Sequence, residues 1–204
     1  MRRVSHTTPC PPTLPSVVPS VVAANAARYA GDEHVRFAEA DLSAVSLPPG
    51  GADLILCRDA LQHIPLLDAI DVLQNFARAR PRVLAVGSYL DGGVGAAGAP
   101  DDAPRPPERN REIPAGEYYH INLLAPPFNM SEPLDILDEN TPVKDARERK
   151  FLLVYAGDYL AELDFDAMRR AAVDGFGAKL ATGDKAKHRA LAVALRAAPE
   201  GMGD

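Results

Sequence analysis

Three residues with chemically versatile side chains follow a short apolar run in the stretch ADLILCRDALQHI, residues 52–64. Arg58 and Asp59 come directly after the run, and His63 lies four residues beyond Asp59. A histidine can act as a general base because its ordinary pKa lies close to neutrality. A histidine at a turn or at the start of a helix is the commoner structural alternative. The sequence therefore leaves His63 as a candidate base or a residue of a helix start.

The residues around Asp59 also have a structural interpretation. Asp59 and Gln62 have the spacing of a capping box, in which the side chains satisfy free amides at the start of a helix. A helix cap would explain the aspartate without any ligand. Arg58 needs an anion or water nearby, because its guanidinium keeps its charge directly after a buried strand. Cys57 is expected to be a small core residue.

Two further groups could bind a ligand. Asp41 closes the stretch HVRFAEAD, where its carboxylate could accept hydrogen bonds from a nucleotide or simply start a loop. Tyr118, Tyr119 and His120 form an aromatic group. This group could line a substrate site or pack against the proline-rich turn that follows it.

Apolar periodicity indicates the elements that position these residues. Strands are predicted at 35–40, 53–57, 82–88 and 151–156, and a helix is predicted for LLDAIDVLQNFARA, residues 66–79. Continuous apolar strands around a helix favour parallel pairing and therefore an α/β sheet with helices on both faces. Ligands of such sheets bind beyond the carboxyl ends of the strands, which is where Asp41, Arg58 and Asp59 stand.

Three shorter elements are expected around this sheet. A helix over 20–29 has Ser20 as its N-cap and Gly31 as its stop. The stretch 117–130 is expected to hold a short strand before an extended Pro-Pro turn, and 132–140 is expected to form a strand or an edge piece.

The domain organisation follows from composition. Prolines make residues 1–19 an irregular segment without a strand long enough to enter a sheet. Residues 20–160 form one partial domain, with a Gly-, Ala- and Pro-rich flexible loop over 91–110. Residues 161–204 form an Ala-rich, charged tail with a helix at 184–198.

Bulk composition excludes several classes of function. A net charge of −6 argues against a nucleic-acid or anionic-membrane binder. The two cysteines, Cys10 and Cys57, make neither a disulfide framework nor a zinc motif, which favours a reducing, cytoplasmic location and no metal. No apolar run approaches the roughly 18 residues of a membrane helix. Residues 1–10 are basic and rich in hydroxyl groups, as in some transit peptides.

Several of these motifs together resemble a known family. The stretch VRFAEADLSAVSLPPGGADLILCRDALQHIPLLDAIDVLQNFARARPRVLAVGSYL, and later NLLAPPF, PLDILDEN and KFLLVYAGDYL, are similar to class I S-adenosylmethionine-dependent methyltransferases. The narrower resemblance is to a branch with a strand-end Cys-Arg-Asp, here 57–59, a nearby Leu-x-His, and Asn-Leu-x-x-Pro-Pro-Phe, here 122–128. It covers roughly residues 17–160.

The resemblance implies a fold, a cofactor and residue roles. The family has a seven-stranded, mostly parallel Rossmann-like sheet with helices on both faces. Asp41, with Leu42, would contact the adenine of S-adenosylmethionine. Cys57, Arg58 and Asp59 would line the cleft between cofactor and substrate. Tyr118 and Asn122 would contact the substrate, and His63 remains the candidate base.

The chain departs from the family at its front. The first strand and its glycine-rich turn are absent, and Ser16 stands where the family has an acid that holds the ribose. In this fold the missing strand lies at the centre of the sheet, and its loss leaves unpaired edges, which are costly. The sequence therefore predicts a truncated domain. The chain is then a fragment, an incomplete gene model or a degenerate relative of the family.

The function that this resemblance implies is methyl transfer from S-adenosylmethionine to an unknown small-molecule or protein acceptor, either kept or lost in the truncated form. One alternative is a non-catalytic remnant or binding module with the same fold. Another is a different doubly wound protein, such as a nucleotide-sugar enzyme. That alternative would need a phosphate-binding glycine turn, and the sequence contains no Gly-x-Gly-x-x-Gly.

Overall fold

The computed structural model describes residues 13–16, 18–50, 52–90, 110–140 and 149–180. Three expectations concern residues that the structure does not describe: the resemblance of residues 1–10 to a transit peptide, the flexible loop over 91–110 and the helix at 184–198. Asn110, at the end of the loop, is described.

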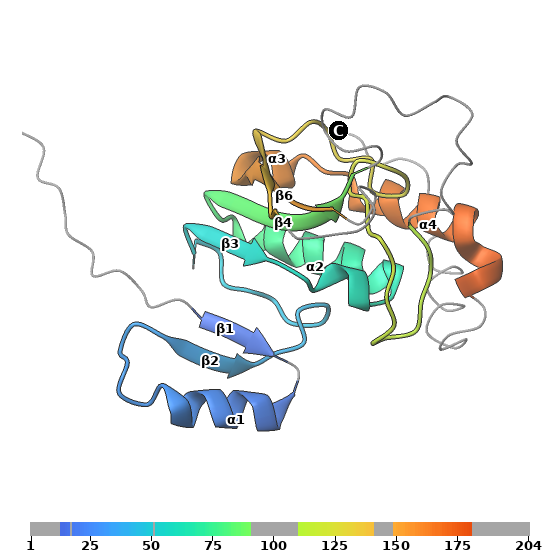
Figure 1. The fold of residues 1–204 in the computed structure, drawn as a ribbon. Helices are drawn as coiled ribbons and strands as arrows, with labels where there is room; N and C mark the ends of the chain where they lie inside the picture. Colours follow the sequence, from blue (N-terminus) through green and yellow to red (C-terminus); the bar gives the residue numbers. More distant parts are fainter. Residues whose placement is uncertain (1–12, 17, 51, 91–109, 141–148, 181–204) are drawn as a thin grey trace, which may run out of the picture.

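The described chain forms two sheets with helices packed against them (Figure 1). The smaller sheet has the order β1-β2 and is parallel, and the larger has the order β3-β4-β6-β5. In the larger sheet β3 and β4 are parallel, whereas β6 runs antiparallel to both β4 and β5. The elements in chain order are β1 Thr13–Ser16, α1 Pro19–Arg28, β2 Arg36–Glu39, β3 Leu54–Cys57, the 3-10 turn η1 Leu61–His63, α2 Leu66–Ala79, β4 Val83–Tyr89, β5 Asp135–Asp138, β6 Lys150–Ala156, α3 Gly157–Ala161 and α4 Phe165–Leu180.

Most of the predicted elements are confirmed. The chain has the α/β class, and strands occur at all four predicted positions. The helix predicted at 66–79 has the same bounds in the structure, because its apolar residues keep strict helical spacing. The stretch 132–140 contains β5, which lies at the edge of the larger sheet, as one of the two expectations for it had proposed.

The prediction that residues 1–19 contain no strand was wrong. Thr13–Ser16 form β1, and Pro15 lies opposite Ala38 of β2. A proline lacks the amide donor of a sheet, but it is tolerated on an edge strand, and β1 pairs only with β2 among the described residues. The many prolines of residues 1–19 therefore gave no indication of β1, an edge strand that needs few amide donors.

Two other local expectations were also wrong. Helix α1 begins at Pro19, which suits the first helical position, so the cap is Val18 and not Ser20. The stretch 117–130 contains turns and no strand. The strand predicted at 151–156 is confirmed as β6, which ends at Ala156, where α3 begins.

The core lies between the larger sheet and α2. Leu66, Ile70 and Leu73 of α2 are fully buried, and Leu84 and Val86 of β4 belong to the same cluster. Successive side chains of a strand point to opposite faces. Accordingly Ile55 and Cys57 of β3 join this cluster, while Leu54 and Leu56 are more than half exposed on the opposite face. Among the described residues, α2, α3 and α4 cover one face of the larger sheet (Figure 1).

Polar contacts join the other elements to α2. Arg169 of α4 is buried, and its guanidinium donates to Asp71 Oδ1 at 2.7 Å and to Gln74 Oε1 at 2.6 Å. The chain that follows β2 is tied to α2 as well: Asn75 Nδ2 donates to the carbonyl of Leu42 at 2.9 Å. The amide of Gly50 donates to the carbonyl of Ala79 at 2.7 Å.

Gly157, at the junction of β6 and α3, lies against the backbone of Pro81. A Cβ atom there would lie 2.8 Å from the carbonyl carbon of Pro81 and closer still to its oxygen. Gly157→Ala should therefore lower the free energy of unfolding by about 1–3 kcal/mol, the usual cost of an overpacked site. Denaturant titration of the purified variant measures this change.

Gly175→Ala is the matched control. Gly175 lies inside α4, and nothing would touch an added Cβ there. Alanine is the better helix former by about 1 kcal/mol, so this variant should gain stability. If Gly157→Ala were as stable as the unchanged protein, the close approach to Pro81 would not constrain the fold.

Candidate functional site

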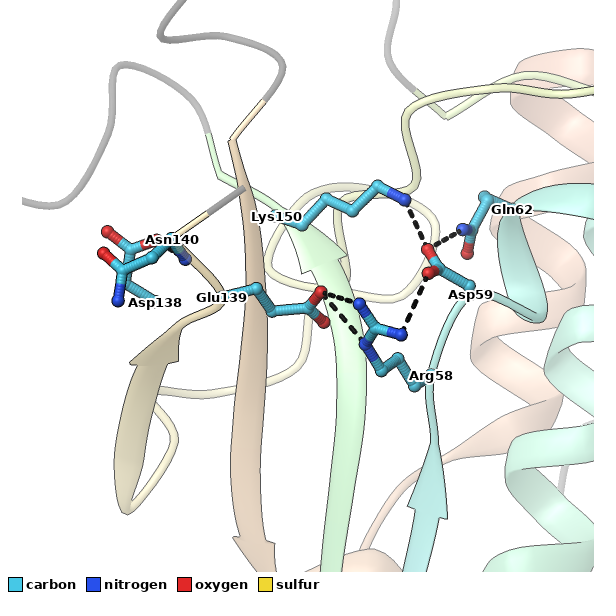
Figure 2. A network of polar contacts seen from close by, with 7 residues as sticks. All are labelled: Arg58, Asp59, Gln62, Asp138, Glu139, Asn140 and Lys150. Carbon is cyan, nitrogen blue, oxygen red and sulfur yellow. Dashed lines mark hydrogen bonds and ion pairs between the residues drawn. The ribbon is translucent and has the colours of Figure 1, made fainter. Parts of the chain in front are cut away.

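Charged residues meet at the edge of the larger sheet where the parallel strands end. β3 ends at Cys57, so Arg58 and Asp59 leave the sheet at this edge. The antiparallel β6 begins at the same edge, and its first residue, Lys150, lies opposite Tyr89 at the end of β4. Figure 2 shows that Arg58, Asp59 and Lys150 point toward one another there. The strand exit at 57–59 that the sequence singled out thus meets the start of β6 at this edge, whereas Asp41 follows β2 of the smaller sheet.

Arg58 reaches across this edge to Glu139, which follows β5. Its Nε and one terminal nitrogen donate to Glu139 Oε2 at 3.1 and 2.9 Å. The Glu139 side chain is only 7% exposed, whereas that of Arg58 is 54% exposed. The anion that Arg58 was expected to need is therefore this nearly buried carboxylate, whose charge would otherwise be costly.

Asp59 is an ion-pair partner, and its predicted role as a helix cap was wrong. Its backbone is left-handed, with φ of 53°, and the cap of the 3-10 turn is Ala60, which makes no side-chain cap bond. Lys150 Nζ donates to Asp59 Oδ1 at 2.5 Å, and Gln62 Nε2 donates to the same oxygen at 2.8 Å. The hydrogen bond from Lys150 lowers the pKa of the Asp59 carboxyl.

The start of α2 has a different partner. The amide of Leu66 donates to Glu112 Oε2 at 2.9 Å, so a carboxylate from another segment satisfies the helix end. Glu112 lies 46 residues away in the sequence, which is why the local pattern pointed to Asp59 instead.

The aromatic residues form a second group beside these charges. Tyr118 donates its hydroxyl to the hydroxyl of Tyr89 at 2.6 Å, and its ring centroid lies 5.5 Å from that of His63 and 5.3 Å from that of His120. Burial is the largest cause that raises the pKa of Tyr118, so this hydroxyl stays a donor at neutral pH. The charge of Lys150 lowers that pKa slightly, and the charge of Asp59 raises it slightly.

His63 has a defined tautomer in this group. Its Nδ1 lies 3.1 Å from the carbonyl of Glu117. A carbonyl can only accept, so in the neutral ring Nδ1 carries the proton and Nε2 keeps its lone pair. Nε2 is thus the atom of His63 that can accept a proton.

Cys57 and Asn122 have structural surroundings. Burial raises the pKa of the Cys57 thiol to about 12, so the predicted core role is confirmed. Asn122 is buried, and its side-chain oxygen accepts the amide of Leu124 at 3.0 Å. Asn110 holds this turn, because its side chain bonds both the amide and the carbonyl of Asn122 at 2.8 Å.

Asp41 and Leu42 lie at the end of the smaller sheet. Asp41 Oδ1 accepts the amide of Ser43 at 2.9 Å and its hydroxyl at 2.7 Å, the arrangement of a loop-starting aspartate. Leu42 packs against the core and is held to α2 by its carbonyl. Asp41 follows the end of β2 much as Asp59 follows the end of β3.

Sequence reasoning missed Glu139, Lys150 and Asn110. Their partners lie 81 residues away for Glu139, 91 for Lys150 and 12 for Asn110. The Asp-Glu-Asn that ends β5 and the lysine that starts β6 are ordinary at the ends of exposed strands, so no local pattern identifies them.

The described residues contain no group of three or more potential metal ligands. Within the same residues, no helix is both long and apolar enough to cross a membrane.

No family model matches the chain, and no curated protein matches it. Two solved structures of a methyltransferase are similar to it in shape. Both are of the N-methyltransferase NodS from Bradyrhizobium japonicum WM9. The first is 14% identical and covers 71% of each chain, with a TM-score of 0.44. The second, in complex with S-adenosyl-L-homocysteine, is 15% identical and covers 71% of this chain and 65% of the other, with a TM-score of 0.45.

The charge of Asp59 can be removed with little change of shape. Asparagine tolerates a left-handed backbone as aspartate does, so Asp59→Asn isolates the ion pair with Lys150. At pH 7 the variant should lose about 0.5–1 kcal/mol, as expected for a partly exposed pair. Because the pKa is lowered in the folded state, this stabilisation is present above 3.8 and disappears as the pH falls through the folded pKa.

Thermal melts at pH 7 and at about pH 2 test this expectation. The deficit of Asp59→Asn should be present in the first and absent in the second. Asp53→Asn is the control, because its pair with Arg82 is almost fully exposed and should contribute nothing measurable. An equal deficit at both pH values would show that asparagine alters the turn and not the ion pair.

Proposed function

We propose that this chain is a domain of the class I S-adenosylmethionine-dependent methyltransferase type, acting on a small-molecule or protein acceptor. The observation that supports it is the placement of two acidic strand exits. Asp41 follows the parallel strand β2, and Arg58 and Asp59 follow the parallel strand β3, as in the sequence motifs that carry the resemblance. Such exits are where doubly wound sheets bind their ligands.

The described residues do not make a complete site for the cofactor. At the end of β1, where a ribose-binding acid is expected, the hydroxyl of Ser16 instead accepts the amide of Val18 at 3.2 Å. A hydroxyl held in this way is a poor substitute for a carboxylate that accepts from both ribose hydroxyls. Among the described residues no strand stands between β1 and β3, so no glycine turn approaches a ligand there.

The acceptor side is more complete. Tyr118 offers a partly exposed ring whose hydroxyl is fixed by Tyr89, and His63 offers Nε2 as a proton acceptor next to it. An acceptor group placed against this ring would be positioned by stacking, and His63 would take a proton if the acceptor must lose one. Lys150 and Asp59 neutralise each other, so this pair does not attract a charged substrate.

A non-catalytic binding module is the second candidate. It is favoured by Ser16, and by the pairing of both cations at the strand exits with carboxylates of the chain itself. The two candidates differ in whether a form with a complete sheet binds the cofactor.

The chain of residues 1–204 should bind S-adenosylmethionine weakly or not at all. Close approach of backbone amides to the ligand needs a glycine turn, and the described strand ends lack one. Isothermal titration calorimetry on the purified chain measures the affinity. A micromolar dissociation constant would contradict this expectation and favour a different mode of binding.

Adding an amino-terminal strand, a glycine turn and a second acidic strand end should create cofactor binding. In that extended protein Asp41→Asn should weaken binding about tenfold to a hundredfold, since a hydrogen bond to a charged group contributes about 1.5–3 kcal/mol. Titration calorimetry of the extended protein and its variants gives these affinities.

Asp32→Asn is the matched control for Asp41→Asn. Asp32 makes the same kind of turn, accepting the amide of His34 at 2.9 Å, but it lies in the connection between α1 and β2. Its variant should bind as tightly as the unchanged protein. Equal binding by both variants would refute the assignment of Asp41 to the adenine, and an extended protein that binds no cofactor would favour the binding module.

A further inference from the structure

Tyr118 presents an exposed ring that is held in one orientation. The residue is 40% exposed, which ordinarily leaves the side chain of a surface tyrosine free to turn. Its hydroxyl, however, donates to that of Tyr89 at 2.6 Å, and the rings of Tyr89 and His120 meet it at interplanar angles of 85° and 88°. Such edge-to-face contacts are a favoured arrangement of aromatic rings. A ring that is both accessible and fixed is a preorganised surface for stacking, because little side-chain entropy is left to lose on binding.

The backbone on both sides of this ring is also fixed. The amide of Gly116 donates to the carbonyl of His63 at 2.8 Å, and the amide of Tyr119 donates to the carbonyl of Gln62 at 3.1 Å. These bonds join the segment of Tyr118 to the 3-10 turn that follows β3. The ring of Tyr118 and the imidazole of His63, whose centroids are 5.5 Å apart, therefore keep a constant relation to each other.

The charges at the neighbouring strand ends cancel in pairs. Burial is the largest cause that raises the pKa of Tyr118; beyond it, Lys150 lowers this pKa and Asp59 raises it. Lys150 and Asp59 form an ion pair with each other, and Arg58 is paired with Glu139 at 2.9 Å, as Figure 2 shows. A charged ligand would lose hydration on binding without gaining a free partner of opposite sign in these pairs. They favour a ligand without a formal charge.

Two further charged residues lie next to the ring and keep this balance. Arg111 donates from its guanidinium to the carbonyl of Tyr118 at 2.9 Å, and Glu117 is the residue before Tyr118. Both are exposed, so that water screens their charges, and the two are of opposite sign. The surface around Tyr118 thus has no excess of either charge.

His63 provides a hydrogen-bond acceptor beside the ring. It is exposed, and Nδ1 of its neutral ring carries the proton that faces the carbonyl of Glu117 at 3.1 Å. Nε2 then has a lone pair and no proton. Within the part of the chain that the structure describes, no group donates to Nε2. A ligand stacked on Tyr118 is therefore complementary to this surface if its edge carries a donor.

We propose that this surface binds a small, uncharged hydroxyaromatic molecule, a phenol whose ring stacks on Tyr118 and whose hydroxyl donates to Nε2 of His63. A phenol is planar and is neutral at pH 7, since a phenolic hydroxyl has a pKa of about 10. It also gives up its proton more readily than an aliphatic alcohol, which lacks the ring as well.

The role of this phenol as the methyl acceptor rests on the proposed function. Its binding does not, because Tyr118 and His63 are in place without a cofactor. The inference therefore names the class of acceptor at the site described above, and its test uses the chain of residues 1–204 alone.

The first measurement is a titration of the purified chain with 4-methylphenol, followed by the amide signals in nuclear magnetic resonance spectra. Signals of residues 116–120 should shift with a dissociation constant in the millimolar range, while those of α1 should not move. 4-Methylanisole has the same ring but no hydroxyl proton. It should bind about threefold to tenfold more weakly, the range expected for one neutral hydrogen bond.

Tyr118→Leu removes the stacking ring and should weaken the binding of 4-methylphenol about threefold to tenfold. Tyr29→Leu is the matched control, because Tyr29 is 41% exposed and contacts the ring of Phe37, but it lies at the end of α1. This control should bind as tightly as the unchanged protein. Melting temperatures of both variants, measured first, separate a loss of binding from a loss of fold.

His63→Leu separates a direct contact from a structural role. Without Nε2 the preference for 4-methylphenol over 4-methylanisole should disappear, whatever the affinity of either compound. His63→Gln, whose side-chain oxygen can accept, should retain part of the preference. A purely structural effect of His63 would weaken both compounds equally and leave the preference unchanged, which would contradict the proposal.

Two charged phenols test the neutrality of the surface. Tyramine carries an ammonium group and 4-hydroxyphenylacetate carries a carboxylate. Neither should bind more than about twofold more tightly than 4-methylphenol, because exposed charges of both signs contribute little. A charged phenol that bound about tenfold more tightly would refute a surface without net charge.

Three other results would also overturn the proposal: equal binding of 4-methylanisole and 4-methylphenol, unaltered binding by Tyr118→Leu, and no binding of 4-methylphenol at all. The last result would leave methyl transfer to a different class of acceptor untouched. Conversely, an extended protein that binds no cofactor would refute the proposed function and leave the binding of the phenol intact.

Discussion

The burial of one apolar face of α2 against β3 and β4 is the interaction on which the remaining structure depends. Leu66, Ile70 and Leu73 lose all contact with water in this interface. The same helix is then the attachment point for three distant segments. Glu112 satisfies its first amide, Arg169 joins α4 to its side, and its last turns hold the chain that follows β2. Loss of this packing would release all three at once.

The candidate site depends on the same interface, because it fixes where β3 and β4 end. Arg58 and Asp59 leave β3 at a place where Glu139 and Lys150 can reach them from β5 and β6. The four charges neutralise one another locally, and a partly exposed pair such as Asp59 and Lys150 adds little stability. Their greater effect is geometric, since they hold the ends of three strands next to the ring of Tyr118.

The sequence predicted the elements whose signal is local. The helix at 66–79 and strand 54–57 follow from apolar periodicity, and the burial of Cys57 follows from its place in an apolar run. β1 was missed because the prolines of residues 1–19 signal irregular chain, and the tolerance for Pro15 comes from the edge position of β1. The role of Asp59 was misassigned because its true partner, Lys150, is 91 residues away. The local sequence pattern determines helices and strands. The partners of a side chain across the sheet can be known only from the fold.

None of the described residues between 13 and 50 is buried, which has a consequence for how the folding of this chain is measured. We therefore expect two units of unequal cooperativity, one built on α2 and one attached to it by loop contacts. Units of low local stability open without global unfolding. A melting curve followed by circular dichroism therefore reports the α2 unit, while proteolysis between residues 13 and 50 reports the other. The calorimetric enthalpy should then exceed the van't Hoff enthalpy, and a single free energy of unfolding would not describe the whole chain.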